Sequence, residues 1–195
     1  MTLSSRFHEA LLYAAQVHAT QLRKGTSIPY VSHVLVVAGL VLENGGDEDE
    51  AIAALLHDAV EDQGGEARLA DIRARFGARV ATIVLGCSDS TVMPKPPWEE
   101  RKRRYLQHLR SAPASDRLVS AADKLANARA ILAAYRAAGG GVWGRFSASR
   151  EQILWYYREL VSAFRATETS PLVDELDRVV MTLETLVEQP PAPET

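Results

Sequence analysis

The sequence has few of the features that mark secreted or membrane proteins. Its 195 residues include one cysteine, Cys87, which cannot form an internal disulfide. No apolar run approaches the roughly 18 residues of a membrane-spanning helix, and the longest, at 34–42, is interrupted by a glycine. The first residues lack the charged and then apolar pattern of a secretory signal. We therefore expect a cytoplasmic protein that does not bind membranes.

A strong charge of either sign is also missing. The formal net charge is −3 and the pI is about 6.0. Proteins that bind nucleic-acid polymers usually have an overall basic bias, so we do not expect such a partner. An anionic small molecule would instead need a local basic pocket. The length favours one domain, which we place at residues 1–188, followed by a disordered tail with three prolines at 189–195.

Apolar residues recur at helical spacing through most of the chain, and no segment pairs convincingly with another as strands. A first helix is predicted at 4–22 and a second at 31–43. Asp47 can cap a third helix, predicted to run without a break over 48–62. Further helices are predicted around 69–76 and 80–87, and at 98–109, 115–138, 153–164 and 172–187. The sequence therefore predicts an all-α fold.

The end of the third predicted helix is the most informative stretch. Residues 51–56 are all apolar, so every face of the helix is apolar there, which predicts a buried helix, where an unpaired charge is costly. The helix then presents four ionisable side chains, those of His57, Asp58, Glu61 and Asp62. On a continuous helix the first and third of these lie one turn apart, as do the second and fourth. They could form a solvated helix end, although carboxylates there oppose the helix dipole, or they could bind a metal ion.

Other stretches could supply further metal ligands. His33 lies in the first turn of the second predicted helix, where a histidine is often structural. Asp123 follows small apolar residues, so we expect it to be buried beside a cation, which could be Lys, Arg or a metal, and Asn127 lies one turn later on the same face. His8 and His18 have no carboxylate at metal spacing and are expected to be surface or packing residues. Two imidazoles and two carboxylates would suit Mn²⁺, Fe²⁺ or Zn²⁺ better than Mg²⁺ or Ca²⁺, and the candidates are His33, His57, Asp58 and Asp123.

Cationic residues provide candidate sites for an anionic ligand. Arg23 and Lys24 are adjacent in a loop punctuated by glycine and proline. Lys95 lies in the proline-containing loop at 88–97, where it could contact a ligand or face water. The run at 101–104 has four consecutive cations, which point around more than one helical turn, so at most two of them could line a pocket.

The order of His33, then His57-Asp58, then Asp123 is the signature of the HD phosphohydrolase superfamily, to which the chain shows a specific resemblance. A closer resemblance, to the hydrolase domain of the bacterial Rel and SpoT alarmone enzymes, is carried by residues 21–24, 29–33, 57–62 and 122–127. It covers roughly residues 4–165, and we expect no synthetase or regulatory domain in this chain. The sequence is thus similar to the stand-alone small alarmone hydrolases.

This resemblance implies about ten helices and a Mn²⁺-dependent removal of the 3′-pyrophosphate of guanosine tetra- and pentaphosphate. The positions that match the family's metal ligands are His33, His57, Asp58 and Asp123. Its catalytic acidic pair matches Glu61 and Asp62, and its nucleotide-contacting positions match Arg23, Lys24 and Asn127. Lys95 matches a phosphate-contacting lysine. Two departures are Val34, where many relatives have proline, and Ala130, which replaces a polar residue expected near the nucleotide.

The matched residues also have a physical role. The acidic pair can orient the attacking water and accept its proton, and two neighbouring carboxylates raise the pKa of one of them. Arg23 could stack on the base while Lys24 contacts phosphate.

Several functions stay open at this point. The favoured one is hydrolysis of (p)ppGpp or (p)ppApp, since no recognisable motif reads the edge of the base. A nucleotidase or phosphodiesterase acting on another phosphoester would keep the metal site, but it would need neither the Arg-Lys loop nor the acidic pair. A non-catalytic nucleotide sensor is disfavoured, because such proteins usually lose a ligand or an acidic residue. A homodimer is retained as an open alternative.

Overall fold

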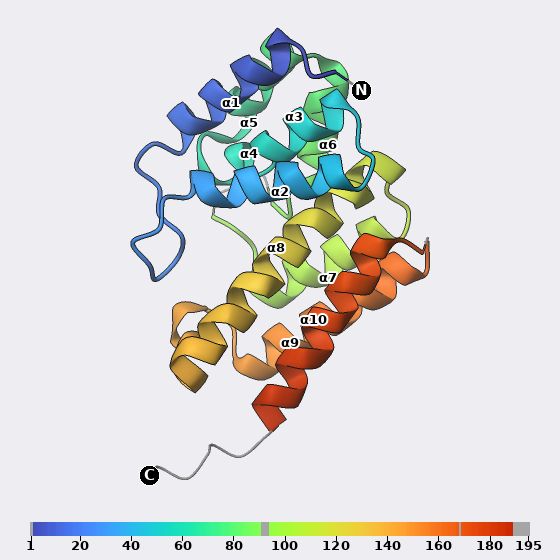
Figure 1. The fold of residues 1–195 in the computed structure, drawn as a ribbon. Helices are drawn as coiled ribbons and strands as arrows, with labels where there is room; N and C mark the ends of the chain where they lie inside the picture. Colours follow the sequence, from blue (N-terminus) through green and yellow to red (C-terminus); the bar gives the residue numbers. More distant parts are fainter. Residues whose placement is uncertain (1, 91–93, 168, 189–195) are drawn as a thin grey trace.

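The computed structural model describes residues 2–90, 94–167 and 169–188, which fold into ten α-helices and one 3-10 helix (Figure 1). The all-α fold and the number of about ten helices are therefore confirmed. The elements are α1 (Ser5–Val17), α2 (Val31–Glu43), α3 (Glu48–Leu56), α4 (Ala59–Asp62), α5 (Gly65–Phe76), α6 (Ala78–Cys87), α7 (Trp98–Leu109), α8 (Ala114–Ala138), η1 (Gly139–Arg145), α9 (Arg150–Arg165) and α10 (Pro171–Glu188). The tail predicted at 189–195 lies outside the described residues.

Helix α3 lies at the centre of the fold because it is apolar on every face after its first turn. Its residues 51–56 are completely buried, and it contacts α1, α2, α6 and α8. Its start is closed by a capping box, in which the side chains of Asp47 and Glu50 each accept a hydrogen bond from the other residue's backbone amide. The long helix α8 continues from this group to α9 and α10 below it (Figure 1). Helices α3 and α8, which carry candidate metal ligands, are thus both packed into the hydrophobic core.

The prediction of one unbroken helix over 48–62 is wrong. Helix α3 ends at Leu56, and the four-residue α4 follows after a turn at His57 and Asp58. The side chain of His57 explains the break, because its Nδ1 lies 2.8 Å from the carbonyl oxygen of Ala54. An unbroken helix would offer that oxygen to the amide of Asp58. Because of this turn, His57 and Asp58 do not lie on one continuous helix with Glu61 and Asp62.

The first helix is also shorter than predicted, since α1 ends at Val17. The chain after it forms an isolated antiparallel bridge between Leu22 and Pro29, in a structure that has no strand among the described residues. Two backbone hydrogen bonds flank the bridge, from the amide of Arg23 to Ile28 (2.8 Å) and from the amide of Tyr30 to Gln21 (2.8 Å). The loop that holds the predicted anion-binding pair is therefore closed at its base.

Among the described residues, no helix combines the length and apolar character that a membrane crossing requires.

Candidate metal centre and substrate cleft

Three separate segments bring the four predicted metal ligands together: the first turn of α2, the turn between α3 and α4, and the middle of α8. His33 Nε2 lies 3.1 Å from Asp123 Oδ1 and 3.6 Å from Asp58 Oδ2. His57 Nε2 lies 3.0 Å from Asp58 Oδ2 and 3.6 Å from Asp123 Oδ1. Residues distant in sequence thus place two imidazole nitrogens against two carboxylate oxygens.

The donor atoms in this cluster fit a divalent metal ion. The Nε2 atoms of His33 and His57 are buried and have no hydrogen-bond partner among the described residues. The carbonyl oxygen of Ala54 can only accept a hydrogen bond, so the Nδ1 of His57 must carry the proton. This arrangement leaves the lone pair of Nε2 facing the carboxylates, as in histidines that bind metals. Unpaired imidazole nitrogens beside carboxylates form a possible metal site, and the geometry alone does not select the metal.

The electrostatics of the cluster also favour a cation. Burial disfavours a charged His57, but the facing Asp58 and Asp123 outweigh this effect, and the pKa of His57 lies well above its ordinary value. Burial raises the pKa of both carboxylates. His57 and His33 outweigh this effect at Asp58, and Lys124 followed by the histidines outweighs it at Asp123, so both pKa values lie well below the ordinary value. The two carboxylates thus favour positive charge between His33 and His57.

Neighbouring side chains hold both carboxylates in position. Lys124 Nζ lies 2.6 Å from Asp123 Oδ2, and the side-chain amide of Asn127 donates to Asp123 Oδ1 at 2.5 Å. The hydroxyl of Tyr30 donates to Asp58 Oδ2. Burial, followed by the effect of Asp58, raises the pKa of Tyr30 far above 10.0, so this residue remains a hydrogen-bond donor. These three side chains therefore fix the orientation of both carboxylates towards the histidines.

The acidic pair lies on α4, beside the ligand cluster, and its two members have different partners. Glu61 accepts hydrogen bonds from Lys95 Nζ (2.8 Å) and from the amide of Asp89 (3.3 Å). Asp62 Oδ2 accepts a hydrogen bond from the side-chain amide of Gln21 (2.8 Å). Loss of water contact raises both pKa values, helped by Asp89 in the case of Glu61 and by Asp58 in the case of Asp62. Both carboxylates are thus better proton acceptors than ordinary surface ones.

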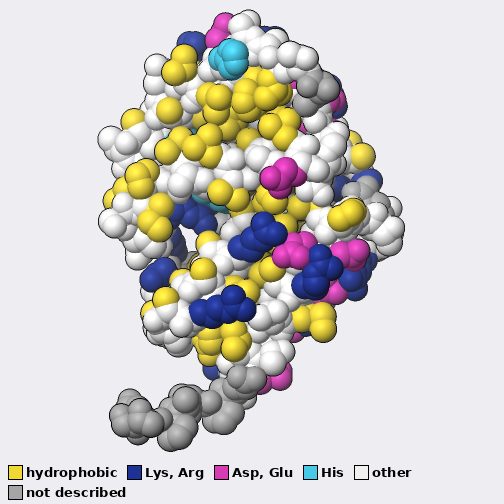
Figure 2. Space-filling view, in the orientation of Figure 1, with side chains coloured by type: hydrophobic (Ala, Val, Ile, Leu, Met, Phe, Trp, Pro, Cys, Tyr) yellow, Lys and Arg dark blue, Asp and Glu magenta, His cyan; other side chains and the backbone are white. Residues whose placement is uncertain are grey.

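A cleft of about 940 Å³ adjoins the ligand cluster, and His33, Asp62 and Asn127 line one part of it. Its cationic lining residues are Arg23, Lys24, Lys102, Lys124 and Arg145. Figure 2 shows Lys and Arg side chains inside a hollow between the helices around α3 and those below them. Arg23 donates to Asn127 Oδ1 at 2.8 Å and so connects the cleft to the second layer of the metal cluster.

Five of the ten predicted site residues line this cleft, and the other five, His57, Asp58, Glu61, Lys95 and Asp123, do not. Of these five, Glu61 and Lys95 form an ion pair with each other, with 2.8 Å between Oε1 and Nζ.

The sequence pattern of the HD domain family matches residues 10–154, which is most of the chain. The chain belongs to the HD domain family. The resemblance drawn from the motifs is also confirmed by curated relatives named guanosine-3′,5′-bis(diphosphate) 3′-pyrophosphohydrolase MESH1. The protein from Xenopus tropicalis is 40% identical over 124 residues, or 62% of this chain and 66% of the relative. The protein from Drosophila melanogaster is 36% identical over 129 residues, or 65% and 69%. The matches therefore span about two thirds of these relatives.

Solved structures of similar proteins share the fold of this HD domain. One was described as a metazoan ortholog of SpoT that hydrolyses ppGpp; it has a TM-score of 0.78 and 30% identity, covering 93% of this chain and 97% of its own. A protein of Listeria monocytogenes has a TM-score of 0.70 and 32% identity, covering 78% and 99%.

Sequence reasoning missed several cleft residues of the HD domain. Lys102 belongs to the cationic run at 101–104, and only packing distinguishes its members. Arg101 and Lys102 both bind Asp89, at 2.6 and 2.5 Å, and Lys102 also lines the cleft. The other two cations form ion pairs with exposed glutamates one turn earlier on α7. Arg145 comes from η1, which lies far from the motifs in sequence, so no local signal identifies it.

Proposed function

We propose that this HD-domain protein hydrolyses alarmone nucleotides, releasing the 3′-pyrophosphate of (p)ppGpp or (p)ppApp with the help of a divalent metal, Mn²⁺ first and Fe²⁺ or Zn²⁺ as alternatives. One observation carries the proposal: a buried set of unpaired metal-type donors adjoins a cleft lined by five cationic side chains. A polyphosphate bound to those cations would place its phosphorus atoms near the donors. The activity for which the curated relatives are named supports the same substrate.

The metal would be held by His33, His57, Asp58 and Asp123, whose donor atoms converge on one point. When bound, a divalent ion supplies Lewis acidity, which lowers the pKa of a water molecule from about 15.7 towards neutrality and offsets charge on the phosphate. Tyr30, Lys124 and Asn127 keep the carboxylates turned towards the cluster.

The acidic pair would handle the proton of the attacking water. Asp62 lines the cleft, and its hydrogen-bond donor among the described residues is the neutral amide of Gln21, so it can take up a proton without losing an ion pair to any of them. Glu61 is held by Lys95 and would orient the water or assist Asp62. The water oxygen then bonds to phosphorus as the bond from phosphorus to the ribose 3′-oxygen breaks. The 3′-oxygen receives a proton, and pyrophosphate leaves.

The remaining cleft residues would bind the nucleotide. Arg23 and Lys24 present a planar fork and a point charge, which suit a base or phosphate and a phosphate respectively. Four alanines of α8 line the cleft beside Lys124, Asn127 and Ile131; they are Ala126, Ala130, Ala133 and Ala134. Their methyl groups cannot hydrogen-bond to a base edge, so these four positions do not select a base, and the proposal includes both guanine and adenine nucleotides.

Hydrolysis of ppGpp and ppApp, each with Mn²⁺, tests the proposal when products are resolved by anion-exchange chromatography. We expect pyrophosphate and the nucleoside 5′-diphosphate. Glu61→Gln should bind Mn²⁺ normally yet lose rate at least a hundredfold, whereas Glu66→Gln, at an exposed glutamate of α5, should retain the rate. A wild-type protein inert towards both nucleotides would refute the proposal and point to another phosphoester.

A further inference from the structure

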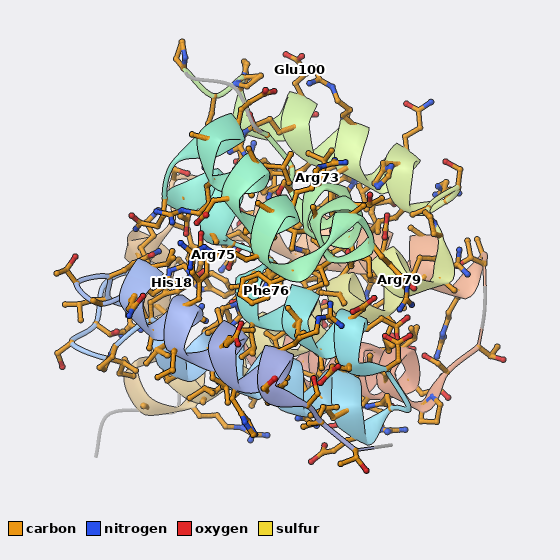
Figure 3. All side chains as sticks on the ribbon, turned by 90° about the horizontal axis from the view of Figure 1, so that it is seen from above. His18, Arg73, Arg75, Phe76, Arg79 and Glu100 are labelled. Carbon is orange, nitrogen blue, oxygen red and sulfur yellow. The ribbon has the colours of Figure 1, made fainter. Side chains whose placement is uncertain are left out.

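A buried histidine outside the cleft is connected to the acidic pair. His18 follows directly after α1 (Figure 3). It is 2% exposed and does not line the cleft. Its Nδ1 lies 2.7 Å from Gln21 Oε1, which also accepts a hydrogen bond from Gln63 Nε2 at 3.0 Å. Gln21 Nε2 in turn donates to Asp62 Oδ2 at 2.8 Å. A chain of side-chain hydrogen bonds thus runs from a core histidine to a carboxylate at the cleft.

The chemistry of Asp62 determines the direction of every hydrogen bond in this chain. An ionised carboxylate can only accept, so the Gln21 atom that faces Asp62 must be the amide nitrogen. The other side-chain atom of Gln21 is then the oxygen, which needs donors. Gln63 supplies one through its amide nitrogen, and His18 supplies the other, so Nδ1 of His18 must carry the proton.

We propose that His18 is a positioning residue, which orients the amide of Gln21 and through it the carboxylate of Asp62. This inference rests on the proposed function, in which Asp62 accepts a proton. Two hydrogen bonds already hold the backbone of Gln21. Its amide donates to the carbonyl oxygen of His18 (3.1 Å), and its carbonyl oxygen accepts from the amide of Tyr30 (2.8 Å). The hydrogen bonds of the side-chain amide then decide which of its atoms faces Asp62. If the amide of Gln21 were flipped, its oxygen would face the carboxylate of Asp62, and the two negatively polarised groups would repel each other.

The two members of the acidic pair are therefore held by different means. Lys95 holds Glu61 with a cation, whereas a neutral amide holds Asp62. A neutral donor fixes the direction of the carboxylate but favours its charged form less than an ion pair does. The hydrogen-bond chain through His18 keeps Asp62 oriented and still able to accept a proton.

Substitutions at His18 separate this role from packing. The ring of His18 lies 5.0 Å from the ring of Tyr30, and His18→Phe keeps an aromatic ring there but removes the donor. We expect kcat to fall about tenfold, with KM within about twofold, because an interaction needed in the transition state is weakened. His18→Asn, which retains an N–H group near the Nδ1 position, should recover most of the rate. Bound metal per protein should stay unchanged in both variants.

A double-mutant cycle with Asp62→Asn gives the decisive kinetic comparison. If His18 acts through Asp62, His18→Phe should cause no further loss of kcat in the Asp62→Asn background. Full additivity of the two losses, or a rate of His18→Asn no better than that of His18→Phe, would overturn the proposal.

A spectroscopic measurement decides the same question without activity. Long-range ¹H–¹⁵N spectra of the wild-type protein should show the neutral His18 ring protonated on Nδ1, and protonation on Nε2 alone would overturn the proposal. A wild-type enzyme inert towards both alarmones would refute the proposed function, and the protonated nitrogen of His18 would still show whether the hydrogen-bond chain exists.

Discussion

Replacement of Asp123 by asparagine is the sharpest perturbation of the metal centre. The change keeps the shape of the side chain and removes one negative charge from between His33 and His57, which lie 3.1 and 3.6 Å away. It also leaves Lys124, whose side chain is 15% exposed, without its carboxylate partner at 2.6 Å. Both metal binding and folding stability should therefore fall.

The expected magnitudes follow from these contacts. Loss of a residue that merely supports a ligand lowers metal affinity by about 10–100-fold, so loss of a charged ligand should cost at least about a hundredfold, or about 2.7 kcal/mol. Removing one partner of a buried ion pair costs about 3–5 kcal/mol. We take the lower end, about 3 kcal/mol, because the asparagine oxygen can still accept a hydrogen bond from Lys124. For a chain of this length, that loss lowers the Tm by about 6–12 °C.

The assay is Mn²⁺ titration calorimetry together with thermal unfolding, and Asp116→Asn is the matched control. Asp116 is a second buried carboxylate on α8, 4% exposed against 5% for Asp123. Burial raises the pKa of Asp116, so its neutral replacement should cost little stability and leave Mn²⁺ affinity unchanged. Wild-type Mn²⁺ affinity in Asp123→Asn, or an equal loss in Asp116→Asn, would refute the assignment of Asp123 as a ligand.

Three further predictions concern the cleft and the core. Lys95→Met should move the acidic limb of the kcat/KM profile to higher pH, because Lys95 lowers the pKa of Glu61 and activity is lost as the pH falls through that pKa; an unmoved limb would contradict this. Gly86→Ala should cost about 1–3 kcal/mol in urea unfolding, since its Cβ would lie 2.1 Å from a carboxylate oxygen of α8, whereas Gly39→Ala, with no atom within 4 Å, should gain about 0.5–1 kcal/mol. Arg23→Lys should raise the KM for ppGpp about tenfold with kcat within about twofold, because the fork that contacts α8 is lost; a normal KM would exclude Arg23 from substrate binding.

Local patterns predicted most helices well, because a helix that packs against a core repeats its apolar residues every three to four positions. Helix α2 begins and ends at the predicted residues, and α8 begins one residue earlier than predicted. The break after Leu56 escaped prediction because it depends on a side chain that competes for a backbone carbonyl, which leaves no mark in the apolar pattern.

The candidate ligands could be named from the sequence because few residue types bind metals and their order matches a known family. Their roles as ligands, and those of Glu61 and Asp62 in proton transfer, stay predictions until the variants are measured. The partners of these residues could not be named. Lys102 and Arg145 reach the cleft from α7 and η1, and Tyr30 reaches Asp58 across 28 residues. A homodimer also stays a prediction.

The sequence by itself determined the helical class, the family and the residues able to form a metal centre, because these follow from periodicity, residue chemistry and order. Only the tertiary structure decided which charges meet. It joined Lys95 to Glu61 and His18 to Asp62, and it selected one cation of four consecutive ones for the cleft. The physical reason is that Coulomb and hydrogen-bond energies depend on distances of a few ångströms between side chains, and packing sets those distances between elements far apart in the chain.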